Sequence, residues 1–203
     1  MLEYIFTRIS AAFNNKVDLY RMGTFYYEGK YVSKDLDKAS DYLKRASDKK
    51  YTKALYYLGL IELEKSDSTI DLALALRYLL LSKNEESNAT SEINKLEAKI
   101  LALPDTQENR ELLFKIGYMY ANDVIIGLNV PKALTFYELA ANHGHNYSQM
   151  ELAKLLTKSR PGVTKDLPRA KELLETAVMN NFEPARIELQ DLLTKHPELA
   201  ATK

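Results

Sequence analysis

The side chains best suited to chemistry in this sequence are its three histidines, because the chain has no cysteine. His143 and His145 flank Gly144, and two imidazoles at this spacing could supply half of a zinc site. A third ligand does not recur nearby, and His196 stands alone near the C-terminus. We therefore interpret the His-Gly-His segment as a turn and expect no metal site.

Asp and Glu together number 28, so carboxylate pairs suited to general acid–base chemistry occur by chance. Most of them stand beside Lys or Arg, as in residues 35–50, where pairing at i,i+4 on an exposed helix face explains them. The sequence shows neither a glycine-rich phosphate loop after a strand nor a Ser, His and Asp set. We expect no catalytic residue, no cofactor and no enzymatic activity.

The charge balance argues against nucleic acid as a partner, because Lys plus Arg also number 28 and leave no basic excess. Arg77 interrupts the most apolar stretch, residues 72–81, so no membrane span is expected. The first 15 residues carry Glu3 and lack the long apolar core of a secretory signal. We expect a cytoplasmic protein, or a periplasmic or secreted one if the chain is a processed form.

Helices must position these groups, because apolar residues recur along the chain with helical spacing. Residues 16–28 and 35–49 form one predicted hairpin, and residues 52–65 and 71–82 form the next, displaced by 36 residues. We call the first helix of each hairpin the A helix and the second the B helix. The sequence therefore predicts an all-α repeat protein.

Small residues recur at fixed positions of the hairpins. Gly23, Gly59 and Gly117 share one position in the A helices, although a helical Gly costs about 1 kcal/mol relative to Ala. This repeated use indicates that a neighbouring helix comes too close for a side chain. The residue four places before the first Ala of each B helix is predicted to cap that helix, and the four caps are Asp35, Asp71, Asn129 and Asp166.

An insertion breaks the repeat between the second and third hairpins. Residues 91–103 carry an apolar stripe that ends before Pro104, and Asp105 with Glu108 has the spacing of a capping box for the next A helix. An unpaired helix cannot join the alternation of A and B helices. We expect it to divide the array into an N-terminal and a C-terminal block.

The N-terminal segment has its apolar residues at i, i+3, i+4 and i+7, which predicts a helix with one buried stripe, made by Leu2, Ile5, Phe6, Ile9 and Phe13. Its phase matches the B half of a truncated repeat. An amphipathic membrane anchor has the same pattern, but the polar face carries little Lys or Arg. The segment from residue 183 is the corresponding A half.

The landmarks resemble those of the Sel1-like repeat, a relative of the tetratricopeptide repeat. The best matches are Met22-Gly23 with Tyr26, Asp35 and Lys38-Ala39, and Ile116-Gly117 with Tyr120, Lys132-Ala133 and Gly144-His145. The last full repeat departs from the pattern with Ala153 in place of Gly, and the second has Glu62 in place of Tyr.

The resemblance implies an α/α solenoid, a right-handed superhelix of about 11 helices. The predicted parts of this single solenoid are a half-repeat helix at 1–15, repeat one at 16–51, repeat two at 52–87, the inserted helix at 88–105, repeat three at 106–145, repeat four at 146–182, and a C-terminal half-repeat helix with a tail at 183–203.

By analogy with such solenoids, the A helices line a concave face that binds a peptide or protein partner. Positions beside the recurring Gly vary between repeats, as a recognition surface can, and we predict partner-binding residues there: Arg21, Thr24, Tyr57, Leu60, Lys115, Tyr118 and Glu151. Tyr26 and Tyr120 recur and are predicted to be buried. The expected function is a non-catalytic adaptor, and the alternative is a stoichiometric inhibitor or immunity-type protein that blocks a partner enzyme or toxin.

Overall fold

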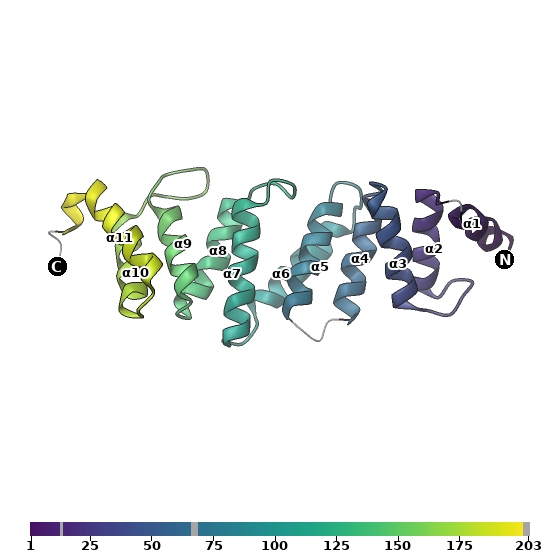
Figure 1. The fold of residues 1–203 in the computed structure, drawn as a ribbon, viewed down its shortest axis with the longest axis horizontal. Coiled ribbons are helices and arrows are strands. Elements are labelled where there is room, and N and C mark those ends of the chain that lie inside the picture. Colours follow the sequence, from purple (N-terminus) through teal and green to yellow (C-terminus); the bar gives the residue numbers. More distant parts are fainter. Residues whose placement is uncertain (13, 66–68, 201–203) are drawn as a thin grey trace. The chain divides into compact units, whose positions relative to one another are not determined.

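The structure, a computed structural model, describes residues 1–12, 14–65 and 69–200, with the backbone alone at residues 69 and 70. Eleven α-helices and one 3-10 helix make up this part of the chain, in which no named strand occurs, and the all-α prediction is confirmed (Figure 1). The chain divides into two compact units, residues 1–100 and 101–203. Each unit is described by itself.

The first unit holds two A–B hairpins behind an N-terminal helix. Its helices are α1 (Leu2–Ala12), α2 (Lys16–Glu28), α3 (Leu36–Asp48), α4 (Lys53–Lys65), α5 (Thr69–Ser82) and α6 (Ala89–Leu101). α2 packs on α3 and α4 packs on α5, while α3 also contacts α4 and α1 contacts α2. The A helices α2 and α4 are neighbours as well.

The second unit repeats this arrangement. Its helices are α7 (Gln107–Asn122), α8 (Val130–Asn142), α9 (Asn146–Leu156), α10 (Leu167–Met179) and α11 (Glu183–Lys195), followed by the 3-10 helix η1 (Pro197–Ala200). The hairpins α7–α8 and α9–α10 are joined by contacts between α8 and α9, and α11 packs on both α10 and α9.

The hairpins are held together by the predicted contact between the A-helix Gly and the B helix. A Cβ placed on Gly23 would lie 2.5 Å from Leu43 Cγ, and one on Gly59 would lie 2.9 Å from Leu79 Cγ. At Gly117 the nearest atom is Tyr137 Cδ1, at 2.6 Å. These distances leave no room for a side chain, so the packing role of the Gly residues is confirmed.

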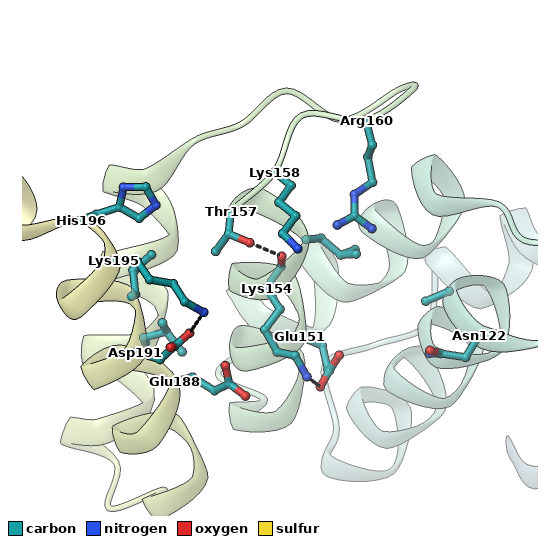
Figure 2. Close-up of a pocket in the computed structure, with 14 residues that line it drawn as sticks. Asn122, Glu151, Lys154, Thr157, Lys158, Arg160, Glu188, Asp191, Lys195 and His196 are labelled. Carbon is teal, nitrogen blue, oxygen red and sulfur yellow. Dashed lines mark hydrogen bonds and ion pairs between the residues drawn. The ribbon is translucent and has the colours of Figure 1, made fainter.

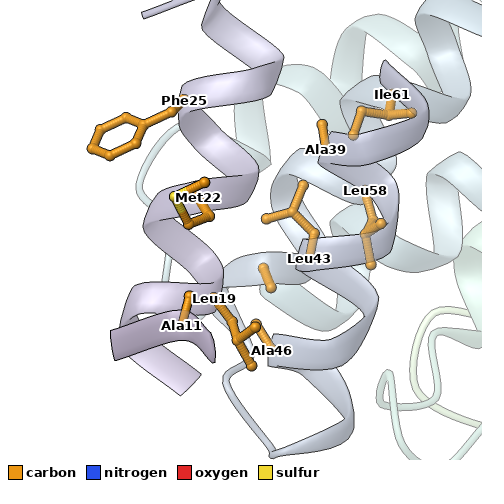
Figure 3. Packing of buried hydrophobic residues seen from close by; sticks show 10 residues of the cluster. Ala11, Leu19, Met22, Phe25, Ala39, Leu43, Ala46, Leu58 and Ile61 are labelled. Carbon is orange, nitrogen blue, oxygen red and sulfur yellow. The ribbon is translucent and has the colours of Figure 1, made fainter. Parts of the chain in front are cut away.

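Buried aliphatic side chains fill the space around this contact. In the first unit, Leu19 and Met22 of α2 face Leu43 of α3, and Leu58 and Ile61 of α4 continue the same core (Figure 3). All five side chains are at most 1% exposed. The core therefore runs without interruption from the first hairpin into the second.

Three of the four predicted B-helix caps are confirmed. The side chains of Asp35, Asn129 and Asp166 accept hydrogen bonds from the backbone N–H groups three residues later, at 2.9 to 3.1 Å. The fourth is wrong, because α5 begins at Thr69 and Asp71 lies inside its first turn. The predicted capping box is also wrong, since Thr106 caps α7 and Asp105 pairs instead with Arg110.

The predicted burial of the N-terminal stripe is wrong as well. Leu2, Ile5, Phe6 and Ile9 are 44 to 71% exposed, and Phe13 lies outside the described residues. α1 instead packs through the opposite face, where Thr7 and Ala11 are buried and the ring of Tyr4 lies 6.4 Å from that of Phe25. The contacts that α1 makes with α2 therefore decide which side of α1 faces inward, and the apolar stripe does not.

Candidate partner-binding surface

The A helices of the second unit line a groove of about 460 Å³ (Figure 2). α7 contributes its C-terminal end at Ala121 and Asn122, α9 contributes the face that carries Glu151 and Lys154, and α11 contributes the face that carries Glu188, Asp191 and Lys195. Lys158 lines the groove from the segment that follows α9. Arg160 and His196 complete the polar lining, and Leu155, Leu174 and Leu192 supply apolar surface. The groove therefore follows the A-helix face of this unit.

Local sequence signals mark the starts of α9 and α11, two of the helices that line the groove. His145 caps α9, because its Nδ1 accepts a hydrogen bond from the Ser148 N–H at 3.2 Å. Pro184 stands in the first turn of α11, where a missing N–H is harmless. The charged residues of α11 that line the groove are spaced at i, i+3 and i+7, so they share one face of the helix.

Two ion pairs neutralise part of the groove. Lys154 Nζ donates to Glu151 Oε1 at 2.8 Å, and Lys195 Nζ donates to Asp191 Oδ2 at 2.6 Å. The hydrogen bond to Glu151 is the main cause that raises the pKa of Lys154, and the nearby carboxylate of Glu188 adds to it. Figure 2 shows Glu188 and Glu151 on either side of the Lys154 ammonium.

Lys158 and Arg160 differ from these paired residues. In the part of the chain that the structure describes, neither the Lys158 ammonium nor the Arg160 guanidinium forms an ion pair. Figure 2 shows both side chains reaching from the segment after α9 toward the groove. They are cationic groups available to a carboxylate, which accepts short, charge-assisted hydrogen bonds from such donors.

Of the three residues predicted in this unit, Glu151 lines the groove, whereas Tyr118 and Lys115 do not. Tyr118 is 53% exposed on α7, and its backbone carbonyl accepts a hydrogen bond from the groove residue Asn122 at 3.0 Å. Lys115 is exposed and its ammonium lies 3.8 Å from Glu111. Lys115 and Tyr118 are three residues apart, so they share one face of α7.

The first unit places the other four predicted residues differently. Arg21 is exposed, whereas Tyr57 and Leu60 are half-buried. Thr24 is buried, and its hydroxyl donates to the backbone carbonyl of Arg21 at 2.9 Å. Thr24 therefore offers a partner little surface, and its hydroxyl hydrogen is already donated within α2.

Tyr57 belongs to a cluster of tyrosines on α2 and α4. Its ring centroid lies 5.8 Å from that of Tyr20, 5.3 Å from that of Tyr27 and 5.4 Å from that of Tyr56. Burial is the first cause that raises the pKa of each of these phenols. The cluster stays neutral at physiological pH and offers aromatic surface with hydroxyl groups that can donate or accept.

The two recurring tyrosines are buried to different degrees. Tyr120 is 2% exposed and lies 5.9 Å from the ring of Phe136, as predicted. Tyr26 is half-buried and stacks on Tyr42 with the ring planes 9° apart. The packing role holds for both, but complete burial holds only for Tyr120.

The two neighbouring histidines point to different carboxylates. His145 Nε2 lies 3.3 Å from Glu111, and burial lowers the pKa of the imidazole. His143 Nδ1 lies 3.3 Å from Asp105. Among the described residues, no three His, Cys, Asp or Glu side chains are grouped so that they could hold a metal ion.

Sequence reasoning missed Lys154, Glu188 and Asp191, although a signal was present. The predicted residues stand two places before and one place after the recurring Gly, and the last of them in the chain is Glu151. One place after Ala153 stands Lys154, and a further 37 residues lead from Glu151 and Lys154 to Glu188 and Asp191. Lys158 and Arg160 follow α9 and have no counterpart in the repeat pattern.

Comparison with known proteins supports the repeat assignment. The family model described as Sel1 repeat matches residues 18–51, 52–85, 111–145 and 146–182. No curated protein matches the chain.

None of the described helices is long and apolar enough to cross a membrane.

Solved structures similar to this chain include two repeat proteins. One is c5321, a protective antigen of uropathogenic Escherichia coli with an SLR fold, at 19% identity and a TM-score of 0.43, covering 95% of this chain and 44% of that one. This chain thus spans less than half the length of c5321. The other is a Sel1 repeat protein from Oxalobacter formigenes, at 24% identity and a TM-score of 0.39, covering 93% of this chain and 82% of that one.

Proposed function

Because the chain belongs to the Sel1 repeat family, whose members are generally protein-interaction scaffolds and typically non-catalytic, we propose that it is an adaptor that binds a peptide or protein on its A-helix face. The observation that carries this proposal is the groove on α7, α9 and α11. The first unit adds the tyrosine cluster as a second contact surface.

The lining of the groove favours a partner segment that carries carboxylates. The Glu151–Lys154 and Asp191–Lys195 pairs already satisfy each other, so they add specificity more than affinity. Lys158 and Arg160 gain most from a partner, because an acidic group would supply their first ion pair. A hydrogen bond to a charged group contributes about 1.5 to 3 kcal/mol, which corresponds to roughly 10-fold to 150-fold in affinity.

Aromatic side chains beside these charged groups complete the proposed surface. Tyrosine is enriched where truncation costs most binding energy, because it combines a large contact area with a hydrogen-bonding end. Tyr118 is exposed next to the groove, and Tyr57 is the half-buried centre of the cluster in the first unit. We propose Tyr118, Glu151 and Lys115 as contacts in the second unit, and Arg21, Tyr57 and Leu60 in the first.

The test compares two cations that flank one loop. Lys158→Glu and Lys165→Glu change the charge by the same amount at exposed positions, but only Lys158 lines the groove. A partner captured from a lysate of the source cells with the wild-type protein is purified and titrated against both variants. We expect Lys158→Glu to weaken binding at least tenfold and Lys165→Glu to leave it unchanged.

Equal affinities for the wild type and Lys158→Glu would remove the groove from the proposed function. Tyr118→Ala should also weaken partner binding, by about 2 kcal/mol, while its helical content stays unchanged. If the captured partner is a single enzyme or toxin that loses activity at a 1:1 ratio, the adaptor proposal gives way to the inhibitor alternative.

A further inference from the structure

The N-terminal helix α1 exposes nearly all its large apolar side chains on one face. In α1, Leu2 is 71% exposed, Phe6 68%, Ile9 53% and Ile5 44%, and Met1, which precedes the helix, is 75% exposed. The side chain of Glu3 is held nearby by a hydrogen bond from Tyr31 Oη at 2.7 Å. A cluster of this kind marks an interaction site on a folded protein.

A groove of about 420 Å³ adjoins this face between α1 and α3. Ile5, Ile9 and Ala12 of α1 line one side, and Tyr42 of α3 lines the other. Its charged lining residues are Arg8 and Arg45. The same surface of the first unit therefore presents protruding apolar side chains, Leu2 and Phe6, and beside them a hollow lined by apolar side chains and two arginines.

Another repeat helix is a poor fit for this face. The A–B contacts of α2–α3, α4–α5 and α7–α8 place the A-helix Gly against the B helix, as Gly23 does at Leu43 and the carbonyl of Ala39, and α9 has the small residue Ala153 at the same position. In α1 the position of Ala39 is held by Glu3. An A helix could not approach α1 in the same way, because the longer side chain occupies the contact.

α11 contrasts with α1, because polar residues stand at and after its recurring Gly position. In α11 the position of the recurring Gly is held by Gln190, which is exposed, and the polar residues Asp191 and Thr194 follow it. The 3-10 helix η1 covers α11 and α10 with the buried Leu199, whose carbonyl accepts a hydrogen bond from Lys171 at 2.8 Å. α1 instead exposes large apolar side chains.

We propose that the apolar face of α1 and the adjoining groove form a two-fold interface between two copies of this chain. In such an interface residue i contacts residue j and j contacts i, so the surface must complement itself. α1 meets this requirement, because Phe6 and Leu2 of one copy can enter the groove beside Ile5 and Ile9 of the other.

The size of the face agrees with a weak dimer. Taking 150 to 200 Å² for a fully exposed side chain of this size, the five residues offer about 500 Å² per copy. Two copies together bury about 1,000 Å², the lower limit for a specific interface. We therefore expect dissociation in the micromolar range.

A membrane surface is the competing occupant, and the charges of α1 disfavour it. Helices that lie on a membrane carry many Lys or Arg beside the apolar face. α1 has Arg8 as its single cation and Glu3 as its single anion, so its side chains carry no net charge.

The experiment measures the oligomeric state by sedimentation equilibrium across a concentration series from about 1 to 300 μM. Phe6→Glu is compared with Ile187→Glu, because Phe6 is 68% exposed in α1 and Ile187 is 70% exposed in α11. We expect Phe6→Glu to raise the dimer dissociation constant at least 100-fold, since a two-fold interface loses the side chain twice. Ile187→Glu should change it less than threefold.

Circular dichroism and thermal unfolding test whether both variants remain folded, which we expect because both positions are exposed. A wild-type protein that is monomeric at every concentration would overturn the proposal, as would a dimer that both substitutions weaken equally. A monomer that co-sediments with phosphatidylcholine–phosphatidylserine vesicles, and loses this binding in Phe6→Glu, would assign α1 to a membrane instead.

Discussion

Replacement of Gly117 by Ala tests the packing that defines the repeat. Ala normally stabilises a helix interior by about 1 kcal/mol relative to Gly. At Gly117 the new Cβ would lie 2.6 Å from Cδ1, 2.7 Å from Cε1 and 3.1 Å from Cγ of Tyr137. The ring is fully buried and rigid, so it cannot turn away from the methyl group without displacing its neighbours.

Overpacking of a filled core costs about 1 to 3 kcal/mol, and the rigid ring places Gly117→Ala near the upper end. After the helix-propensity gain is subtracted, we expect a net loss of about 1 to 2 kcal/mol. For a chain of this length the melting temperature should fall by roughly 2 to 8 °C.

Gly59→Ala is the matched control, because Gly59 holds the same repeat position in α4. Its nearest neighbours are Cγ and Cδ2 of Leu79, at 2.9 and 3.0 Å. An aliphatic side chain yields more readily than a phenol ring, so we expect a change within about 1 kcal/mol of zero. Ala153→Gly, at the same position of α9, should cost about 1 kcal/mol or more.

Urea denaturation followed by circular dichroism gives the unfolding free energies of the three variants. Helix propensity alone predicts that Gly117→Ala and Gly59→Ala stabilise the protein equally. A stabilised Gly117→Ala would therefore refute the argument that the Tyr137 ring excludes a side chain. Recovery of stability when Gly117→Ala is combined with Tyr137→Leu would support it, because Leu is the residue that faces the Gly in the first two repeats.

Four further predictions concern single contacts. Tyr137→Phe should leave the urea midpoint unchanged or raise it, because the buried Tyr137 hydroxyl has no hydrogen-bond partner among the described residues. Lys50→Gly should raise the unfolding free energy by about 0.5 to 1 kcal/mol, and the melting temperature with it. Lys50 has a φ of 59° at the turn after α3, where a side chain is strained. Asp166→Ala should lower the unfolding free energy by about 1 kcal/mol through loss of the α10 cap. Burial lowers the pKa of His145 in the folded protein, so the neutral imidazole contributes its full stabilisation above the pKa of the unfolded chain. The unfolding free energy should fall as the pH drops below that value. The urea midpoint should therefore fall less between pH 7 and pH 5 in His145→Asn than in the wild type.

Local and recurring signals were enough to predict the helices and their hairpins. The caps at Asp35, Asn129 and Asp166 bond to backbone N–H groups three residues away, so the sequence next to each helix was enough to predict them. The recurring Gly could be interpreted because its energetic cost in a helix calls for a nearby compensating contact. The same repetition identified the A-helix face and led to Glu151 in the groove.

Contacts between helices decided what repetition could not. The apolar stripe of α1 has the period of a buried face, yet Tyr4, Thr7 and Ala11 on the other side face inward, because burial depends on which surface α2 offers. Thr24 stands at a variable position but is buried, since the packing of α2 with its neighbours covers it.

The charged groove is likewise a property of the assembled second unit. Lys158 and Arg160 lie outside the repeated positions, and their place at the groove depends on the course of the segment after α9. Periodicity assigns each residue to a face of its own helix. Which faces meet, and which charges remain unpaired, is set by the packing of helices that are distant in sequence.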